Sequence, residues 1–370
     1  MSNPGERLDV LDGLRGVAIS LVVWYHVWLV SGLSIAAVNF IAEAGFLGVD
    51  LFFFISGFCL FYPYARAELE HRAIPSTRRF FMRRAAKIVP SYLLALIVFA
   101  AVYRDRFASA GDVAAALATH LTFLHTLDPD TFGAISGPLW TIGVEVQFYF
   151  LFPLICVPFR KSPLLAYAVL VAIAEGYRIA LGALHLDATF WIFNQLPAYL
   201  DIFGAGMLAA YTFVAVRNRQ SFPDRRMLTV VSAALIGAGI AVLAHVTSID
   251  RASGMDATYA WVNAHRIVLG PLFVALAVST AYSAAPWRAF IATRPLVFLS
   301  VISYNLYLWN LEIAVWLHDA GLSPWGSFAL SIVASLGVAT AITYLLERPI
   351  LRATEPPRAA QCILGEEGRP

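Results

Sequence analysis

The sequence predicts an all-α integral membrane protein of about ten transmembrane helices, with N- and C-termini in the cytoplasm. Of its 370 residues, 59% are hydrophobic and 14% are charged, whereas soluble proteins have about 25% charged residues. The mean hydropathy is +0.71, and apolar runs of membrane-spanning length recur along the chain. We therefore expect one transmembrane domain over residues 1–350 and a short cytoplasmic tail over 351–370.

The predicted spans are separated by short polar loops. They lie at 14–33, 44–64, 88–103, 140–159, 163–183, 192–216, 227–246, 262–283, 296–318 and 324–346. The segment 111–127 is moderately apolar and leaves two alternatives. If it is interfacial or re-entrant the chain has ten spans, and if it crosses the membrane there are eleven and every later span is reversed.

The basic residues favour ten spans. With ten, one side of the membrane receives Arg66, Arg72, Arg78, Arg79, Arg83, Arg84, Lys87, Arg160, Lys161, Arg217, Arg219, Arg225, Arg226, Arg288, Arg294, Arg348, Arg352, Arg358 and Arg369. The other side holds only Arg104, Arg106, Arg178, Arg251 and Arg266. The positive-inside rule then places both termini in the cytoplasm. The first apolar run, about twenty residues long, is too long for a cleavable signal peptide.

The first span, Arg7–Val30, carries two ionisable residues inside an apolar helix. Arg15 and His26 are eleven residues apart, which returns them to nearly the same helix face about 16 Å apart. Ionisable groups in hydrocarbon cost about 2.5 kcal/mol or more, so they usually face a bundle interior or an aqueous cavity. The alternative is that Arg15 reaches the headgroups and that His26 is a hydrogen-bonded core residue.

The ten-span topology brings several polar residues to the outer half of the membrane. These are His26 of the first span, Asp50 of the second, Glu145 of the fourth, and Asn310 and Glu312 of the ninth. Arg178 lies at the outer end of the fifth span, where it is a candidate contact for developing negative charge. Because such groups are costly in the membrane, their common depth indicates a functional site.

A second cluster is expected at the cytoplasmic face. Asp12 lies one turn before Arg15, and Glu347 at the end of the last span is a candidate partner for Arg15 from another helix. The run RRFFMRRAAKIVPSY contributes Arg83, Arg84 and Lys87, followed by Tyr92. Arg83 and Lys87 share a helix face because they are four residues apart. Such a patch suits a polyphosphate or anionic lipid headgroups.

The polar residues suggest proton removal from a hydroxyl. A buried histidine can act as general base, and a carboxylate, either Glu145 or Asp50, can orient it. The sequence has no G-x-S-x-G elbow, P-loop, dinucleotide fingerprint or HExxH pair. Its three cysteines have no metal-binding spacing. We therefore expect no metal and no tightly bound cofactor, and we expect direct transfer of a group from an activated carrier to a hydroxyl.

Seven motifs occur in an order that resembles one known family. They are LDGLRG followed by His26, GFLGVDLFFFISGF, MRRAAKIVPSY, LWTIGVEVQFYF, FGAGMLA, ISYNLYLWN and LLERP. Together they resemble the acyltransferase-3 family of bacterial multi-pass membrane O-acyltransferases, over about residues 7–350. Each motif alone is weakly specific, whereas their order is strongly so.

The resemblance implies an enzyme of the bacterial inner membrane that moves an acyl group, often acetyl, from cytoplasmic acyl-CoA to a hydroxyl of a sugar, glycan or similar acceptor. It implies His26, Glu145 and Asp50 at the catalytic centre. It maps the donor-binding residues to Arg15, Arg83, Arg84, Lys87 and Tyr92. The family often has a histidine where this chain has Trp309 and Asn310. Some members carry a further esterase-like domain, so we expect this chain to act alone or with a separate periplasmic acyl-acceptor protein.

Several alternatives stay open from the sequence. His26 is either a general base or a transient acyl carrier, and the sequence does not specify the acceptor, the acyl length or the oligomeric state. The intramembrane histidine and carboxylates also suit a proton-coupled transporter, although the halves show no inverted repeat. A third reading is a glycan-assembly subunit that binds no acyl-CoA.

Overall fold

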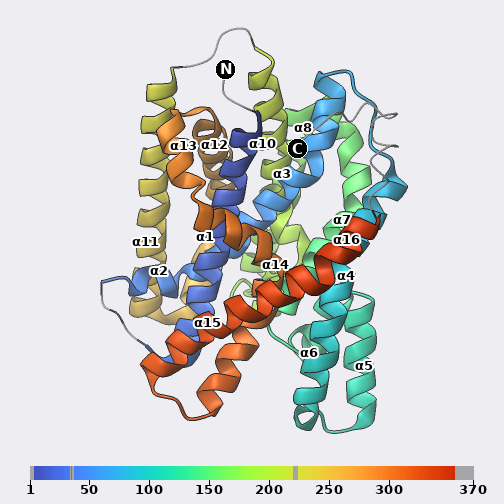
Figure 1. Ribbon diagram of the computed structural model, residues 1–370, viewed down its shortest axis with the longest axis vertical. Coiled ribbons are helices and arrows are strands. Elements are labelled where there is room, and N and C mark those ends of the chain that lie inside the picture. Colours follow the sequence, from blue (N-terminus) through green and yellow to red (C-terminus); the bar gives the residue numbers. More distant parts are fainter. Residues whose placement is uncertain (1–3, 34, 36, 220–223, 355–370) are drawn as a thin grey trace.

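The computed structural model of the protein describes residues 4–33, 35, 37–219 and 224–354. Within these ranges every regular element is helical, which confirms the predicted all-α class. Most of the predicted tail, 351–370, lies outside the described residues. Long helices run side by side along one direction, and α15 crosses the front of them at a slant (Figure 1).

The elements follow one another with short connections. They are α1 (Pro4–Ser31), α2 (Asn39–Glu43), η1 (Gly45–Leu47), α3 (Gly48–Leu69), α4 (Thr77–Val102), η2 (Arg104–Arg106), α5 (Ala110–Leu121), η3 (His125–Leu127), α6 (Pro129–Phe132), α7 (Leu139–Lys161), α8 (Pro163–Ala183), α9 (Phe190–Phe193), η4 (Leu196–Tyr199), α10 (Leu200–Arg217), α11 (Arg225–His265), η5 (Arg266–Val268), α12 (Leu269–Tyr282), α13 (Ala285–Ile291), α14 (Arg294–Asp319), α15 (Pro324–Ile342), η6 (Thr343–Glu347) and α16 (Arg348–Thr354).

The described residues contain nine helical segments long and apolar enough to cross a membrane. One of them, Arg225–Tyr282, has 58 residues, about twice the length that a single crossing needs. It changes direction at Gly254, whose φ of 85° lies in the left-handed region that favours glycine. The returning part, which includes α12, packs against α11. This segment therefore supplies two passes, which agrees with the ten that the sequence predicts.

The segment 111–127 does not form a span. Its helix α5 has 12 residues, about 18 Å at 1.5 Å per residue, against a hydrocarbon thickness of about 30 Å. It packs beside α4 (Figure 1). The basic run before the third predicted span is itself helical, because α4 begins at Thr77, where Ser76 caps it by accepting from the Arg79 N–H. The arginines at 83 and 84 and Lys87 are thus held on a rigid helix.

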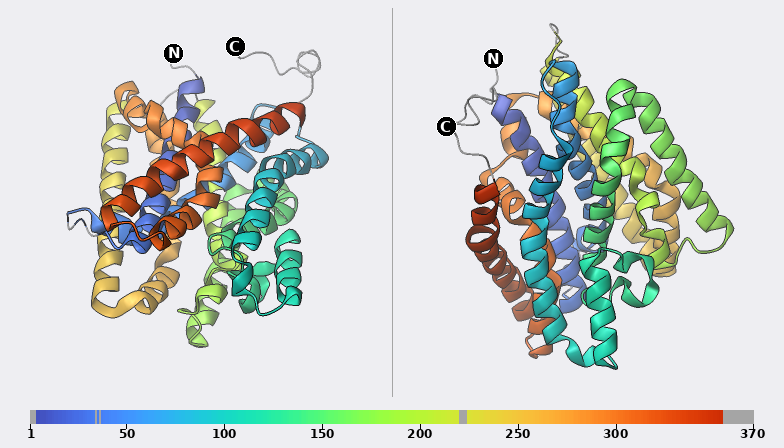
Figure 2. Two further views of the ribbon diagram at one scale, coloured as in Figure 1. Left: turned by 60° about the horizontal axis from the view of Figure 1, so that its bottom comes forward. Right: turned by 90° about the vertical axis from the view of Figure 1, so that its right-hand side faces the viewer.

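The centre of the bundle consists of α1, α3, α10 and α14, whose closest pairings are α1 with α14 and α3 with α10. Both pairings depend on glycine. A Cβ at Gly16 would overlap the Leu296 carbonyl, and a Cβ at Gly206 would overlap that of Phe54. Small residues allow such close backbone approach between membrane helices. Outer helices such as α8 and α15 instead expose apolar side chains, as lipid contact requires, and Figure 2 shows them at the periphery.

The variant Gly206→Ala should lower the thermal stability of the purified protein, because its methyl group has to displace the α3 backbone. Overpacking of this kind costs about 1–3 kcal/mol. The matched variant is Gly237→Ala, where nothing lies within 4 Å of an added Cβ, and it should leave the melting temperature unchanged or raise it slightly. The melting temperatures of both variants can be measured by fluorescence-detected size-exclusion chromatography after heating. Equal melting temperatures would contradict the close approach of α10 to α3 at Gly206.

Two histidines join α5 to the start of α7. The rings of His120 and His125 stack with centroids 4.0 Å apart. His120 Nδ1 lies 2.7 Å from the Ala116 carbonyl oxygen, and His125 Nε2 lies 3.1 Å from that of Leu139. Burial lowers the pKa of His120 to about 3, with a further contribution from His125, and burial lowers the pKa of His125 to about 4. Both imidazoles are therefore neutral in the folded protein near pH 7.

The folded state should lose stability as the pH falls from about 6.5 toward 4. In this range an exposed histidine binds a proton and the two buried ones do not, so unfolding takes up protons. Within that range, each histidine lowers the free energy of unfolding by up to about 1.4 kcal/mol for each pH unit of acidification. Melting temperatures of the wild type and of His120→Gln/His125→Gln, measured between pH 7.5 and 4.5, test this. A wild-type pH dependence no steeper than that of the double variant would contradict the assignment.

Candidate active site

Two cavities open within the described part of the bundle, with volumes of about 140 and 200 Å³. The first, here called the basic cavity, is lined by Arg15, Arg84 and Lys87 together with Glu145. The second, here called the histidine cavity, is lined by His26, Asp50 and Arg266. The predicted site residues are therefore divided between two adjoining chambers.

The basic cavity contains three cations and one carboxylate. Arg84 lies with its guanidinium 5.7 Å from the Tyr149 ring centroid, and its Nε has no hydrogen-bond partner among the described residues. Glu145 accepts a hydrogen bond from Ser56 Oγ at 2.6 Å. Arg15 donates to Cys59 Sγ at 3.4 Å. The excess of positive charge suits a ligand that carries several negative charges.

Glu347 contacts Lys87 rather than Arg15. Its carboxylate pairs with the Lys87 ammonium and accepts from Asn305 Nδ2 at 3.0 Å. Glu347 ends η6, a π-helical turn in the last membrane segment, and such turns often occur at functional sites. Asp12 accepts from Ser300 Oγ at 3.0 Å. The carboxylate of Glu347 thus fixes the position of Lys87 at the edge of the basic cavity.

His26 is oriented by an amide from α14. Its Nδ1 lies 2.7 Å from Asn310 Oδ1. Asn310 Nδ2 donates to the Leu306 and Tyr307 carbonyl oxygens at 2.8 and 2.9 Å, so Oδ1 is the atom that faces the imidazole. An amide oxygen only accepts, so Nδ1 must carry the proton and the neutral ring has its lone pair on Nε2. This tautomer is the one that a general base at Nε2 requires.

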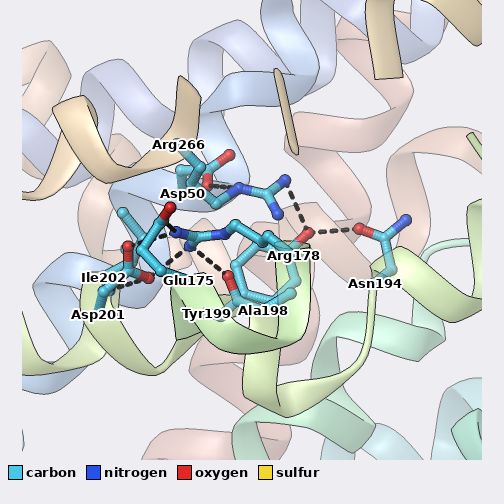
Figure 3. Close-up of polar contacts among 9 residues, drawn as sticks. All are labelled: Asp50, Glu175, Arg178, Asn194, Ala198, Tyr199, Asp201, Ile202 and Arg266. Atoms are coloured by element: carbon cyan, nitrogen blue, oxygen red, sulfur yellow. Dashed lines mark hydrogen bonds and ion pairs between the residues drawn. The ribbon is translucent and has the colours of Figure 1, made fainter. Parts of the chain in front are cut away.

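Asp50 forms an ion pair with Arg266, with Oδ1 2.9 Å from Nε. The guanidinium also lies over the Tyr199 ring, 4.3 Å from its centroid. Figure 3 shows this cluster and the neighbouring pair of Arg178 and Asp201, in which Arg178 Nη2 lies 2.7 Å from Asp201 Oδ1. Arg266 is 3% exposed, and its Nη1 has no hydrogen-bond partner among the described residues. It is therefore a donor available to a ligand of the histidine cavity.

The other predicted site residues line neither cavity. Arg83 is exposed beside the basic cavity, and Tyr92 is buried with its hydroxyl on the His120 carbonyl oxygen at 3.3 Å. Glu312 accepts from Tyr103 and Ser136. Arg178 is enclosed by Asp201, Glu175 and the Ala198 carbonyl. These four residues therefore lie where they support or flank the cavities.

Three residues of the cavities are missed by the sequence analysis. Ser56, Arg266 and Tyr307 line the cavities, and none of them was predicted as a site residue. Arg266 is one of the few arginines on the side that the sequence predicts to be opposite the cytoplasm, and this scarcity could have marked it as a candidate site residue. The partners of His26 and Glu145 depend on which helices lie next to each other. The hydrophobic periodicity of the sequence does not specify this.

The comparisons with known proteins agree with this architecture. A family model described as an acyltransferase domain matches residues 8–348, so the chain belongs to the acyltransferase-3 family. It is 25% identical to the O-acetyltransferase OatA of Staphylococcus aureus over 366 residues, which is 93% of this chain and 57% of that protein.

A second relative is protein 2 in the picA locus of Rhizobium radiobacter, 32% identical over 162 residues, which is 39% of this chain and 80% of that protein. The chain spans about half the length of the Staphylococcus aureus relatives that it matches. No solved structure matches it.

Substitution of Asn310 should impair turnover more than donor binding. Asn310→Ala removes the acceptor that fixes the His26 tautomer, and we expect kcat for acyl transfer to fall by about 10²-fold, the lower end of the contribution of a general base. KM for the acyl donor should change little, because Asn310 does not line the basic cavity. Steady-state kinetics test this, and a rise in KM at constant kcat would contradict the positioning role.

Proposed function

We propose that the protein is an acyl-CoA-dependent O-acyltransferase that moves an acetyl-sized group from cytoplasmic acyl-CoA to a hydroxyl of a sugar or similar acceptor. The observation that carries the proposal is the pair of adjoining cavities, one cationic and one containing His26 with its basic nitrogen defined by Asn310. The family membership supports acyl transfer, and the similarity to the O-acetyltransferase OatA supports an oxygen acceptor.

The basic cavity is the proposed donor site. A coenzyme A carries phosphates, which arginine and lysine bind by charge-assisted hydrogen bonds. Arg84 and Lys87 meet this need from α4, and Arg15 lines the same cavity from α1. The distribution of basic loops supports a location of this end of α4 at the cytoplasmic face of a bacterial inner membrane, where acyl-CoA is made.

The histidine cavity is the proposed acceptor site. His26 Nε2 takes the proton of the acceptor hydroxyl as its oxygen attacks the thioester carbonyl carbon. The carbon–sulfur bond breaks, and the coenzyme A thiolate takes the proton back from His26. The products are an ester and free coenzyme A, with no redox partner required. Arg266 Nη1 is a donor for an acceptor oxygen, and aromatic residues such as Trp140 and Tyr259 provide apolar walls.

Purified protein in nanodiscs should consume acetyl-CoA when a sugar acceptor or water supplies the hydroxyl that takes the acetyl group, and His26→Ala should reduce that rate by about 10²–10⁴-fold. The variant should fold, because His26 is only half-buried and the side-chain hydrogen bond that it loses is the one to Asn310. Release of coenzyme A measured with a thiol reagent gives the rates, and melting temperatures control for folding. Near-wild-type release by His26→Ala would contradict the proposed base.

The neighbouring arginines 83 and 84 provide a matched pair for the donor site. Arg84→Gln should raise KM for acetyl-CoA by about tenfold or more, since a hydrogen bond to a charged group contributes about 1.5–3 kcal/mol. Arg83→Gln removes the same charge from an exposed position outside the cavity and should change KM by less than about threefold, the range of an exposed ion pair. Equal effects of the two variants on KM would mean that acetyl-CoA is attracted to the basic face in general, and they would contradict a defined donor site at Arg84.

A further inference from the structure

We infer that Tyr307 separates the two cavities and selects the acyl groups that reach His26. Among the described residues, Val49 and Tyr307 are the two that line both chambers. Arg15 and Glu145 lie on one side of this partition, and His26 lies on the other. The acyl-selecting role rests on the proposed function, whereas the separation of the cavities stands on geometry alone.

Tyr307 is held in place from both sides. Its hydroxyl donates to the Pro138 carbonyl oxygen at 3.3 Å and lies 2.9 Å from Thr141 Oγ1. Pro138 lines the histidine cavity and Thr141 lines the basic cavity. The ring meets Phe52 edge-on, with centroids 6.1 Å apart, and lies 6.4 Å from the His26 ring. The side chain is 7% exposed, so it fills the space between the chambers.

The same turn of α14 positions the base and the partition. Asn310 donates to the Tyr307 carbonyl oxygen and accepts from His26. An acyl thioester in the basic cavity must extend past the Tyr307 ring for its carbonyl carbon to reach a hydroxyl beside His26. A two-carbon acyl group requires the least displacement of the ring, and each added methylene requires more. Tyr307 therefore favours short acyl groups. It also separates the water that enters from one face of the membrane from the water that enters from the other.

The separation can be tested without an enzymatic assay, because Cys59 lines the basic cavity and not the histidine cavity. In a background with Cys156→Ser and Cys362→Ser, a membrane-impermeant trimethylammonium methanethiosulfonate is added to spheroplasts and to inverted vesicles. In the parent, Cys59 should react from one face only. Tyr307→Ala should make Cys59 reactive from both faces, with at least a tenfold faster rate from the previously closed face.

Two further variants control this experiment. Tyr307→Phe keeps the ring and should keep one-sided labelling. Val49→Ala should open the partition from its other member, and it is the second test in case Tyr307→Ala fails to fold. Tyr177→Ala removes a tyrosine that lines neither cavity and whose hydroxyl donates to the Ile192 carbonyl oxygen, and it should also keep one-sided labelling. If folded Tyr307→Ala and Val49→Ala are labelled from the same faces as the parent, the partition is overturned.

The selectivity is tested with acetyl-CoA and hexanoyl-CoA. The ratio of kcat/KM for the longer to the shorter donor should rise by about tenfold or more in Tyr307→Ala, given the range expected for added methylenes in a pocket, and should stay constant in Tyr307→Phe. An unchanged ratio in folded Tyr307→Ala overturns the selecting role. If the wild type consumes no acyl-CoA, the proposed function fails, and the labelling pattern still decides whether Tyr307 separates the cavities.

Discussion

The hydrogen bond between His26 and Asn310 is the interaction on which the rest of the site depends. It joins α1 to α14, the pair of central helices whose close packing requires glycine on α1. It also determines the tautomer of His26. The Asn310 amide nitrogen donates to two backbone carbonyl oxygens, so only the side-chain oxygen can contact the imidazole. The contact therefore fixes the nitrogen of His26 that has a lone pair. A carboxylate is not required for this, since an amide oxygen orients the ring without adding buried charge.

Three buried carboxylates elsewhere form ion pairs. Asp50 meets Arg266, Asp201 meets Arg178, and Glu347 meets Lys87. Such pairs offset the cost of desolvation when their geometry is good, and removal of one partner is strongly destabilising. Arg84 Nε in the basic cavity and Arg266 Nη1 in the histidine cavity have no hydrogen-bond partner among the described residues. These donors are the ones that the two proposed substrates would use.

The sequence predicts the fold well because hydropathy and span length are local properties. The ten passes and the non-spanning segment 111–127 follow from run lengths, and the α11–α12 hairpin merely extends two predicted spans. The site is only partly predictable. Periodicity places Arg15 and His26 on one face, but Glu145 bonds to Ser56, and His26 bonds to Asn310. Which residues meet depends on helix rotation and on glycine-limited crossings, which are set by long-range packing.

The most direct measurement is a structure by electron cryo-microscopy of the protein in nanodiscs with acetonyl-CoA, in which a methylene inserted between the sulfur and the carbonyl carbon turns the labile thioester into a stable ketone. The account predicts coenzyme A phosphates against Arg84 and Lys87, with the ketone group beside Tyr307 and pointing toward His26. Density for the analogue outside the basic cavity, or with its acyl end directed away from Tyr307, would contradict a donor site on one side of the partition and a base on the other.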